Sequence, residues 1–276
     1  MKAVDCAAQA TKTKSMMAGP RNLPLPPALD PRQALFLDFD GTLVEIAAAP
    51  DRVMVARALP WLLSALAVRL AGAVAVISGR PLDELAQLLD PFAGPLVGMH
   101  GLERRTADGM LVRAPLPAGL GRARALLADF VAVRPHLLLE DKGSGLALHY
   151  RRAPVTASAC RNAALRAAAL AGDAFELIEG KMVVELRPHE AHKGRAIVAL
   201  LAEPPFHGRL PVFIGDVRTD EDGFVVVNDM GGLSVQVGRY ADTAARYGIP
   251  DVDGVLAWLV AALVQDSRTA SLREFR

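Results

Sequence analysis

The stretch ALFLDFDGTL, residues 34–43, constrains the possible folds of this chain more than any other stretch. It begins with an apolar run, interrupted only by Asp38, whose length is typical of one buried strand. A carboxylate at a buried strand end is costly in free energy unless a cation, a proton or hydrogen-bond donors lie nearby. Asp40 follows closely, and an oxygen-seeking divalent cation such as Mg2+ relieves the repulsion between two such acids. Gly41 then allows a sharp turn that brings backbone N–H groups towards a bound anion. The alternative interpretation is an ordinary turn rich in Asp and Gly.

The segment DFDGTL resembles the first motif of the haloacid-dehalogenase-like phosphatases. The resemblance implies that Asp38 is the nucleophile and forms an aspartyl-phosphate, a covalent route that is open to a carboxylate. It also implies that Asp40 is the general acid/base, which protonates the leaving sugar oxygen and later deprotonates the attacking water. We expect Gly41 and Thr42 of the same motif among the substrate-binding residues.

Composition narrows the class of protein. The 276 residues exceed one average domain, and the 52% of hydrophobic residues supply a sizeable core. A net charge of +1 provides no basic field for nucleic acid. The two cysteines, Cys6 and Cys160, form no CxxC or Cys/His pattern, so neither a disulfide framework nor a zinc site is predicted.

The ends of the chain carry no recognisable membrane or secretion signal. Residues 1–27 lack a continuous apolar core and have the composition of a disordered tail. No apolar stretch approaches the roughly 20 residues that span a bilayer. We therefore expect a soluble, cytoplasmic protein that is a monomer or a weak homo-oligomer and binds neither membrane nor nucleic acid.

Short apolar runs alternate with segments of helical periodicity before residue 105 and again after residue 192. This alternation predicts a Rossmann-like parallel sheet with helices on both faces. Between these parts the pattern changes to helix, two strands, helix, two strands, with a hairpin turn at 142–144, which predicts an α+β cap inserted into the α/β core. The expected division is a tail at 1–27, a core at 28–110 and 189–276, and a cap at 111–188, with hinges near 105–117 and 188–192.

Further polar residues follow or precede the predicted elements at the same edge of the sheet, where the carboxyl ends of parallel strands meet. Ser78 follows a strand, Lys193 opens a helix, and Asp216 and Asp220 follow a later strand. Taken singly, they could be a turn serine, a solvated lysine and helix-capping acids. Their order resembles the remaining motifs of the same family. The resemblance implies that Ser78 and Lys193 hold the phosphoryl group.

Phosphoryl transfer requires a nucleophile, a cation and donors around the phosphoryl oxygens. The resemblance implies that Mg2+ is held by Asp38, Asp216 and the backbone carbonyl of Asp40, with Asp220 as a further acid of the metal site. One position departs from the family pattern. Val217 follows Asp216 where the family usually has a second acid, which bears on metal affinity and rate.

Six stretches in order narrow the resemblance to the trehalose-6-phosphate phosphatase family over about residues 34–264: DFDGTLVEIAAAPDRV, VISGRPLDEL, GMHGLERR, ALHYR, GKMVVELRP and HKGRAI. The resemblance implies hydrolysis of trehalose 6-phosphate, the last step of trehalose biosynthesis, under a cap that closes over the disaccharide. The further substrate contacts that it implies are Gly79, Arg80, His100, Arg104, Lys142, His149, Arg151, Lys181 and Glu185. Charged partners suit sugar hydroxyls, and binding energy remote from the phosphate can orient it. Each of these residues alone could equally be an ordinary strand or turn residue.

Two alternatives remain open. A capped phosphatase for another sugar phosphate, such as sucrose phosphate or glucosylglycerol phosphate, would share the core chemistry and differ only in the cap. A catalytically silent regulatory module would share the fold but is expected to lose the nucleophile or the acid/base, and Asp38 and Asp40 are both present. A nucleotide-binding protein is disfavoured because the chain has no GxxxxGK[ST] or GxGxxG stretch.

Overall fold

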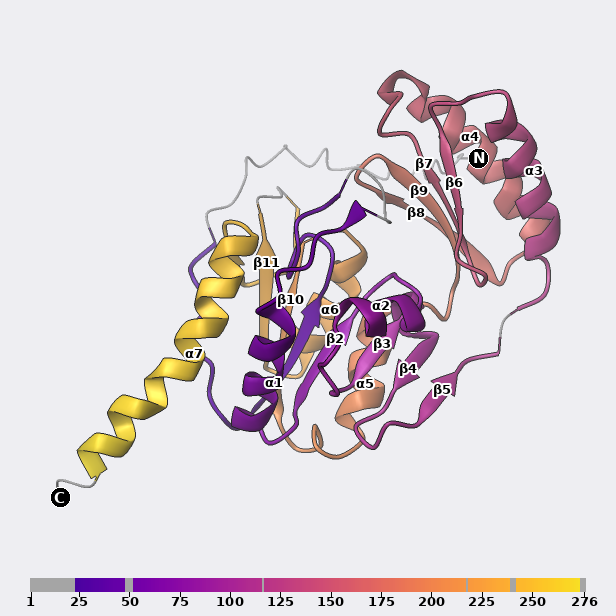
Figure 1. Cartoon of the computed structure of the whole chain (residues 1–276). Coiled ribbons are helices and arrows are strands. Elements are labelled where there is room, and N and C mark those ends of the chain that lie inside the picture. Colours follow the sequence, from indigo (N-terminus) through magenta and orange to yellow (C-terminus); the bar gives the residue numbers. More distant parts are fainter. Residues whose placement is uncertain (1–22, 48–51, 116, 217, 239–241, 274–276) are drawn as a thin grey trace, which may run out of the picture.

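The computed structural model of the chain describes residues 23–47, 52–115, 117–216, 218–238 and 242–273 (Figure 1). An eight-stranded sheet forms the core, with the order β12-β11-β10-β1-β2-β3-β4-β5. Its strands are β1 (Gln33–Asp38), β2 (Val74–Ile77), β3 (Leu96–Gly98), β4 (Glu103–Arg105), β5 (Leu111–Arg113), β10 (Leu210–Gly215), β11 (Leu233–Val237) and β12 (Tyr247–Ile249). Every pairing from β12 to β3 is parallel, and β4 and β5 extend the sheet in antiparallel fashion.

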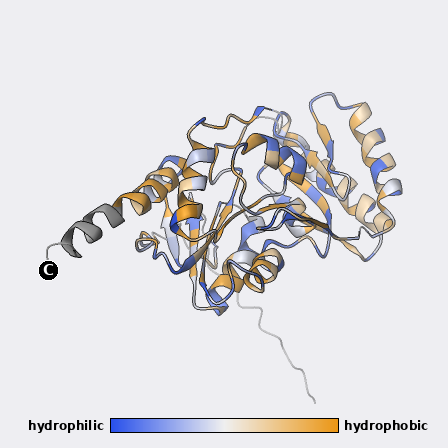
Figure 2. Ribbon diagram, turned by 60° about the horizontal axis from the view of Figure 1, so that its bottom comes forward, coloured by the Kyte–Doolittle hydropathy of each residue, from blue (hydrophilic) through white to orange (hydrophobic). Residues whose placement is uncertain are grey.

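The central strands β1, β2 and β10 are mostly apolar and buried because helices cover both faces of the sheet. The core helices are α1 (Leu59–Arg69), α2 (Leu82–Leu88), α5 (Lys193–Leu201), α6 (Glu221–Asp229) and α7 (Val252–Arg273). Short 3-10 turns lie at Met99–Gly101 and Arg218–Asp220 in the core and at Pro154–Thr156 in the cap. From β1 the chain adds β2 and β3 on one side, and from β10 it adds β11 and β12 on the other. Right-handed crossovers in opposite directions put α1 and α6 on opposite faces. Accordingly α1 packs with α7 and α5 packs with α6 (Figure 1), and hydrophobic residues dominate the central strands (Figure 2).

The cap is a four-stranded antiparallel sheet covered by two helices on one face. Its elements are α3 (Leu120–Ala132), β6 (Leu138–Asp141), β7 (Leu146–His149), α4 (Ala157–Ala171), β8 (Phe175–Gly180) and β9 (Val183–Pro188), with the strand order β6-β7-β9-β8. Alternate residues such as Leu146, Leu148 and Leu186 pack with α3 and α4 in a hydrophobic core separate from that of the large sheet. The residues between them, including Glu185, lie on the opposite face because strand side chains alternate. The predicted α/β core with an inserted α+β cap is therefore confirmed.

One boundary differs from the sequence-based division. Residues 111–113 were expected to open the cap, but they form β5, which pairs with β4 at the edge of the core sheet. The sequence pattern does not predict β4 and β5, because both strands are short and β4 is the charged segment ERR. The two segments that connect core and cap pass a small hydrophobic cluster. Met99, Leu102 and Ala191 are buried in it, and Ala114 packs against them.

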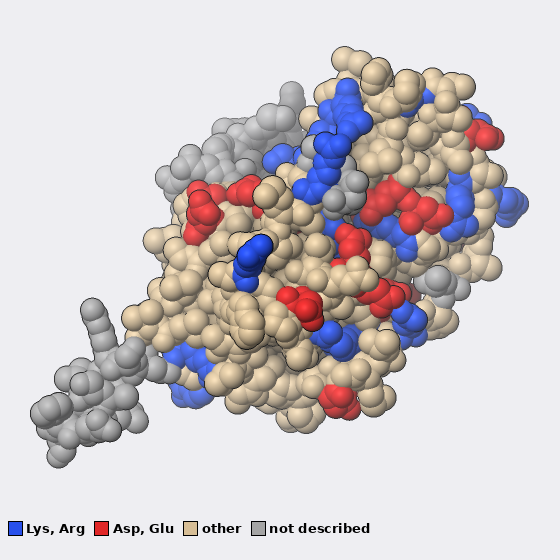
Figure 3. Space-filling model, viewed as in Figure 1, with Lys and Arg blue, Asp and Glu red and all other residues tan. Residues whose placement is uncertain are grey.

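No helix of the described ranges combines the length and the apolar character that crossing a bilayer requires. On the face of the molecule drawn in Figure 3, acidic and basic side chains are interspersed. The predicted tail falls largely on residues 1–22, which lie outside the described residues.

Candidate active site

Polar residues that follow three parallel strands meet at one edge of the core sheet. Asp38 is the last residue of β1, and its neighbours in the sheet place Ser78 just past β2 and Asp216 just past β10. Asp38, Ser78 and Asp216 are all buried. Residues more than 100 positions apart in sequence thus share one small volume, as expected where the carboxyl ends of parallel strands converge.

Lys193 lies at the centre of this acidic cluster. Its Nζ atom donates to Asp38 Oδ1 at 2.5 Å and to Asp220 Oδ1 at 2.5 Å, and its side chain is almost completely buried. Burial lowers the pKa of Lys193, but Asp220 and Asp38 outweigh burial and raise that pKa above its ordinary value. Thr42 Oγ1 donates to Asp38 Oδ2 at 3.2 Å, so both oxygens of this carboxylate have a hydrogen-bond donor.

The surroundings of Asp216 do not compensate the negative charge that this residue carries when it is ionised. Its backbone N–H donates to Asp220 Oδ2 at 3.0 Å, but its own Oδ1 is buried and has no hydrogen-bond partner among the described residues. Burial together with Asp38 and Asp220 raises the pKa of Asp216 to about 9. Burial and the acids Asp220 and Asp40 raise the pKa of Asp38 to about 7, although Lys193 opposes them. One carboxylate oxygen from each of Asp38, Asp216 and Asp220 lies within 4.8 Å of the others. Three clustered acids and an orphaned oxygen are the donor set that Mg2+ prefers.

Gly41 is required by this arrangement for two reasons. Its φ of +85° lies in the left-handed region, and a Cβ atom there would lie 2.0 Å from Asp216 Oδ2. The turn after β1 therefore brings its backbone directly against the Asp216 carboxylate. The N–H of Gly41 donates to the carbonyl of Val44 at 2.7 Å, which closes the turn.

Asp40 turns away from the acidic cluster towards Arg80. Arg80 Nε donates to Asp40 Oδ2 at 2.7 Å and Arg80 Nη2 donates to Asp40 Oδ1 at 2.8 Å. Arg80 also forms a close ion pair with Glu84, one turn further along the chain. The sequence predicted Arg80 as a substrate-binding residue and gave no sign of this pairing with Asp40.

Hydrogen bonds connect the segment that follows β2 to the segment that follows β3. Ser78 Oγ accepts the N–H of Arg80 at 3.1 Å, and the carbonyl of Ser78 accepts the N–H of His100 at 2.9 Å. Gly79 lies against the His100 ring, since a Cβ atom there would lie 2.6 Å from Nε2. His100 is thereby held in the left-handed region, with φ of 55°, and its ring is buried beside the cluster.

Three of the predicted sugar-binding residues meet where the cap touches the core. Glu185 of β9 accepts from Lys142 Nζ at 2.9 Å, and the same oxygen lies 3.3 Å from Nε2 of the core residue His100. Burial raises the pKa of Glu185, but Lys142 and His100 outweigh burial and hold that pKa well below its ordinary value. Burial lowers the pKa of His100 despite Glu185.

Two further predicted residues lie on the cap side of this contact. His149 Nε2 is 2.8 Å from Glu140 Oε2 across the β6–β7 pair. Arg151, just past β7, reaches the core carbonyl of Ala47 at 3.4 Å and the carbonyl of Lys181 at 3.3 Å. Glu140 was not predicted, because β6 reads LLED and has no alternation of apolar and polar residues that would indicate its face.

One predicted substrate contact, Arg104, is paired outside the site. Arg104 forms two hydrogen bonds with Glu203, at 2.8 and 3.2 Å, just beyond the end of α5. This pairing spans 99 residues and has no signature in the sequence. Val217, the departure from the family pattern, lies outside the described residues.

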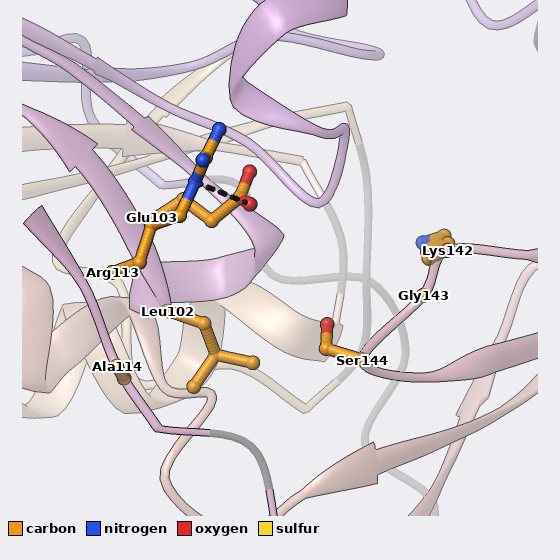
Figure 4. A pocket seen from close by; sticks show the side chains of 7 residues that line it. All are labelled: Leu102, Glu103, Arg113, Ala114, Lys142, Gly143 and Ser144. Carbon is orange, nitrogen blue, oxygen red and sulfur yellow. Dashed lines mark ion pairs between the residues drawn. The ribbon is translucent and has the colours of Figure 1, made fainter. Parts of the chain in front are cut away.

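Two cavities adjoin the contact between cap and core. A cleft of about 1600 Å³ has Gly41 and Asp216 at the core side and Arg151 and Lys181 at the cap side. This volume exceeds the roughly 300–1,000 Å³ of common ligand pockets, so a disaccharide fits. A second cavity of about 150 Å³ lies between Leu102, Glu103, Arg113 and the turn 142–144 (Figure 4). At about 30 Å³ per water it accommodates a few waters and no sugar.

A capped α/β core of this kind is also found in a solved haloacid dehalogenase-like hydrolase from Bacteroides thetaiotaomicron. The TM-score is 0.53 over 83% of this chain and 98% of that chain, and the identity is 16%, so this likeness concerns the fold alone. The chain belongs to the trehalose-phosphatase family, whose model matches residues 36–250. It is 43% identical over 242 residues to the trehalose-6-phosphate phosphatase of Escherichia coli, covering 87% of this chain and 91% of that protein. It is 42% identical over 231 residues to a probable trehalose-phosphate phosphatase of Sinorhizobium fredii, covering 83% of this chain and 87% of that protein.

The same fold is found in a solved structure. The C-terminal domain of Candida albicans trehalose-6-phosphate phosphatase superposes with a TM-score of 0.75 over 88% of this chain and 99% of that chain. Its sequence identity is 22%, so this likeness concerns the fold alone.

Proposed function

We propose that this protein hydrolyses trehalose 6-phosphate to trehalose and inorganic phosphate, the last step of trehalose biosynthesis, in the cytoplasm. The observation that carries the proposal is the group of Asp38, Lys193, Asp216 and Asp220 at one sheet edge, directly beneath a cap whose polar face carries Lys142 and Glu185. Membership of the trehalose-phosphatase family and the names of relatives at 42% and 43% identity support the choice of substrate.

The chemistry proceeds in two displacements. A carboxylate oxygen of Asp38 attacks phosphorus as the bond from phosphorus to the sugar oxygen breaks, and the leaving oxygen takes a proton from the Asp40 carboxyl group. A water oxygen then attacks the phosphorus of the aspartyl-phosphate and gives its proton to Asp40. The bond from phosphorus to Asp38 breaks, which releases inorganic phosphate and restores both carboxyl groups to their starting states.

Lys193 and Ser78 serve the transferred group. The Lys193 ammonium lies 2.5 Å from Asp38 Oδ1, where it can balance charge on the nucleophile and on the phosphoryl oxygens. Ser78 is buried at the end of β2, and its hydroxyl lies at the same sheet edge. Preorganised donors of this kind stabilise a transition state without reorganising during the reaction.

Mg2+ fits the acidic cluster, because Asp216 has an unpartnered buried oxygen and three acids converge. Asp38 and Asp216 would hold the ion, with the backbone carbonyl of Asp40 and with Asp220 close by. When bound, the ion supplies positive charge to the phosphoryl oxygens and suppresses the repulsion among the acids.

The cap supplies specificity. Its polar face meets the core at the contact of Glu185 with His100, and Arg151 and Lys181 line the large cleft beside it. Sugar hydroxyls that replace these internal partners would contribute binding energy remote from phosphorus, which orients the phosphate. A closed cap also limits access of bulk water before the nucleophile has reacted.

The test measures phosphate release from a panel of sugar phosphates with Mg2+ for the wild type and for Asp38→Asn. The matched control is Asp30→Asn, because Asp30 precedes β1, at the end of the strand opposite to Asp38. We expect release from trehalose 6-phosphate in wild type and in the control, and none in Asp38→Asn or with EDTA. Release from another sugar phosphate alone would keep the mechanism and reject the substrate. No release from any of them would favour a silent regulatory module.

A further inference from the structure

We propose that Arg80 is a positioning residue for Asp40 and not a ligand of the substrate phosphate. The inference rests on the proposed function, in which Asp40 exchanges a proton with the leaving oxygen. Arg80 presents its Nε and Nη2 atoms to the two oxygens of Asp40, at 2.7 and 2.8 Å. This planar, two-bond pairing is the most specific geometry that an arginine and a carboxylate can form. It fixes both the position and the plane of the Asp40 carboxylate.

The guanidinium group is itself held from several sides. Arg80 is 7% exposed, and its Cζ lies 5.6 Å from the centre of the Phe39 ring, a residue that is fully buried beside Asp40. Glu84 pairs with Nη1, on a different part of the guanidinium from the edge that meets Asp40. Two carboxylates on separate parts of one planar group leave it little freedom to turn.

The backbone of Arg80 is anchored as firmly as its side chain. Its N–H donates to Ser78 Oγ at 3.1 Å, and its carbonyl accepts the N–H of Met99 at 2.9 Å. Pro81 follows with a restricted φ, and α2 begins at the next residue, which brings Glu84 one helical turn away from Arg80. The guanidinium therefore has a rigid base at the end of β2 and a rigid partner on α2.

The pairing has a consequence for the order of events at Asp40. In this arrangement both oxygens of Asp40 accept N–H bonds from Arg80. In the acid step one oxygen must turn to the leaving group while the other keeps its bond to Arg80. Arg80 thus holds one oxygen of Asp40 in place while Asp40 acts first as the general acid and then as the general base.

The alternative is that Arg80 binds the phosphoryl group, and the two roles differ in their dependence on the leaving group. Every phosphate monoester presents the same phosphoryl group, so loss of a phosphate ligand would slow all substrates equally. General acid catalysis matters for a sugar alkoxide and little for p-nitrophenolate, which departs without a proton. A variant that misplaces Asp40 will therefore slow trehalose 6-phosphate selectively.

The experiment measures kcat/KM for trehalose 6-phosphate and for p-nitrophenyl phosphate, both with Mg2+, in wild type, Asp40→Asn, Arg80→Gln, Arg80→Lys and the double variant Asp40→Asn/Arg80→Gln. The ratio of the two constants cancels differences in the fraction of folded enzyme. We expect Asp40→Asn to lower the ratio by about 10²–10⁴-fold and Arg80→Gln by about 10²-fold, the effect of misplacing a catalytic group by about 1 Å. Arg80→Lys should lower it less, and the double variant no more than Asp40→Asn alone.

The matched control is Arg32→Lys. Arg32 pairs with Asp30 through the same two-bond geometry, at 3.0 and 2.8 Å, before the opposite end of β1. Its ratio should equal that of wild type. An unchanged ratio in Asp40→Asn would reject the acid role in the proposed function. A lowered ratio in Asp40→Asn with an unchanged ratio in Arg80→Gln would overturn the positioning role alone.

Discussion

Asp216 in the core and Glu185 in the cap are both buried carboxylates, at 6% and 8% exposure, and their surroundings act in opposite directions. Burial raises the pKa of Asp216 to about 9, and the neighbouring acids Asp38 and Asp220 add to that effect. Burial also acts on Glu185, but Lys142 and His100 overcome it and hold the pKa of Glu185 well below its ordinary value. The core thus disfavours the ionised form of Asp216 unless a cation lies close by, whereas Lys142 and His100 already favour the ionised form of Glu185.

The difference assigns different tasks to the two regions. Unbalanced buried charge is costly for stability and is found where chemistry needs it. A balanced pair at the tip of a cap can exchange its partners for sugar hydroxyls at little net cost in hydrogen bonds. The core cluster is therefore the reacting centre, and the contact between cap and core is the recognition element in the proposed function.

The largest effect is expected when the core loses its internal cation. Lys193→Met keeps the length of the side chain but leaves Asp38 and Asp220 without the ammonium that now lies 2.5 Å from each. Removing one partner of a buried ion pair costs about 3–5 kcal/mol of unfolding free energy. The measurement is urea unfolding in EDTA, repeated with Mg2+, which should restore part of the loss. Lys142→Met is the matched variant in the cap, and it should lose less because Glu185 keeps His100. Equal losses in the two variants would contradict the comparison.

The next effect concerns catalysis through the cap. Glu185→Gln removes the charge that joins Lys142 of the cap to His100 of the core. We expect kcat/KM for trehalose 6-phosphate to fall by about 10²-fold, since remote contacts position the phosphate. The small substrate p-nitrophenyl phosphate should be little affected. Steady-state kinetics with Arg166→Gln, an exposed residue of α4, serve as control. A similar loss for both substrates would mean that Glu185 serves the core chemistry instead.

The core should also make the metal-free protein sensitive to high pH. The folded-state pKa of Asp216 lies near 9, above its ordinary value of 3.8. Between these values the folded chain holds a proton that the unfolded chain has lost, so stability falls as pH rises through this window. From pH 6 to pH 8 we expect a loss on the order of 2 kcal/mol in EDTA. Chemical unfolding at both pH values measures it. Asp216→Asn should flatten the dependence, as should saturating Mg2+ in the wild type, and a stability that rises with pH in EDTA would contradict the prediction.

The sequence indicated which residues meet at the edge of the core sheet better than it indicated the pairings of long side chains, for a physical reason. Asp38, Ser78 and Asp216 follow apolar strands, and parallel strands bring their carboxyl ends to one edge. Their meeting thus follows from the order of the elements. The pairings of Arg104 with Glu203 and of Arg80 with Asp40 depend on which way long side chains turn, and no periodicity records that.

The sequence pattern did not predict the short strands for a related reason. β12 (Tyr247–Ile249) and the charged β4 have no apolar run of strand length. They form because their backbone groups hydrogen-bond to those of a neighbouring strand, which is β11 for β12 and β3 for β4. Tertiary context of this kind outweighs local propensity.

The smallest effect should come from the cap contact, and it should have the opposite sign in pH. Burial lowers the pKa of His100 below its ordinary value of 6.5, despite Glu185. As pH falls through 6.5, the unfolded chain takes up a proton that the buried imidazole resists, so the stability that neutral His100 contributes is lost. Stability should therefore fall from pH 7 to pH 5 through this group. Thermal unfolding of wild type, His100→Gln and the exposed control His207→Gln measures it. Only His100→Gln should reduce the loss at low pH. If His207→Gln reduces it equally, the effect belongs to the net charge of the protein and not to the contact between cap and core.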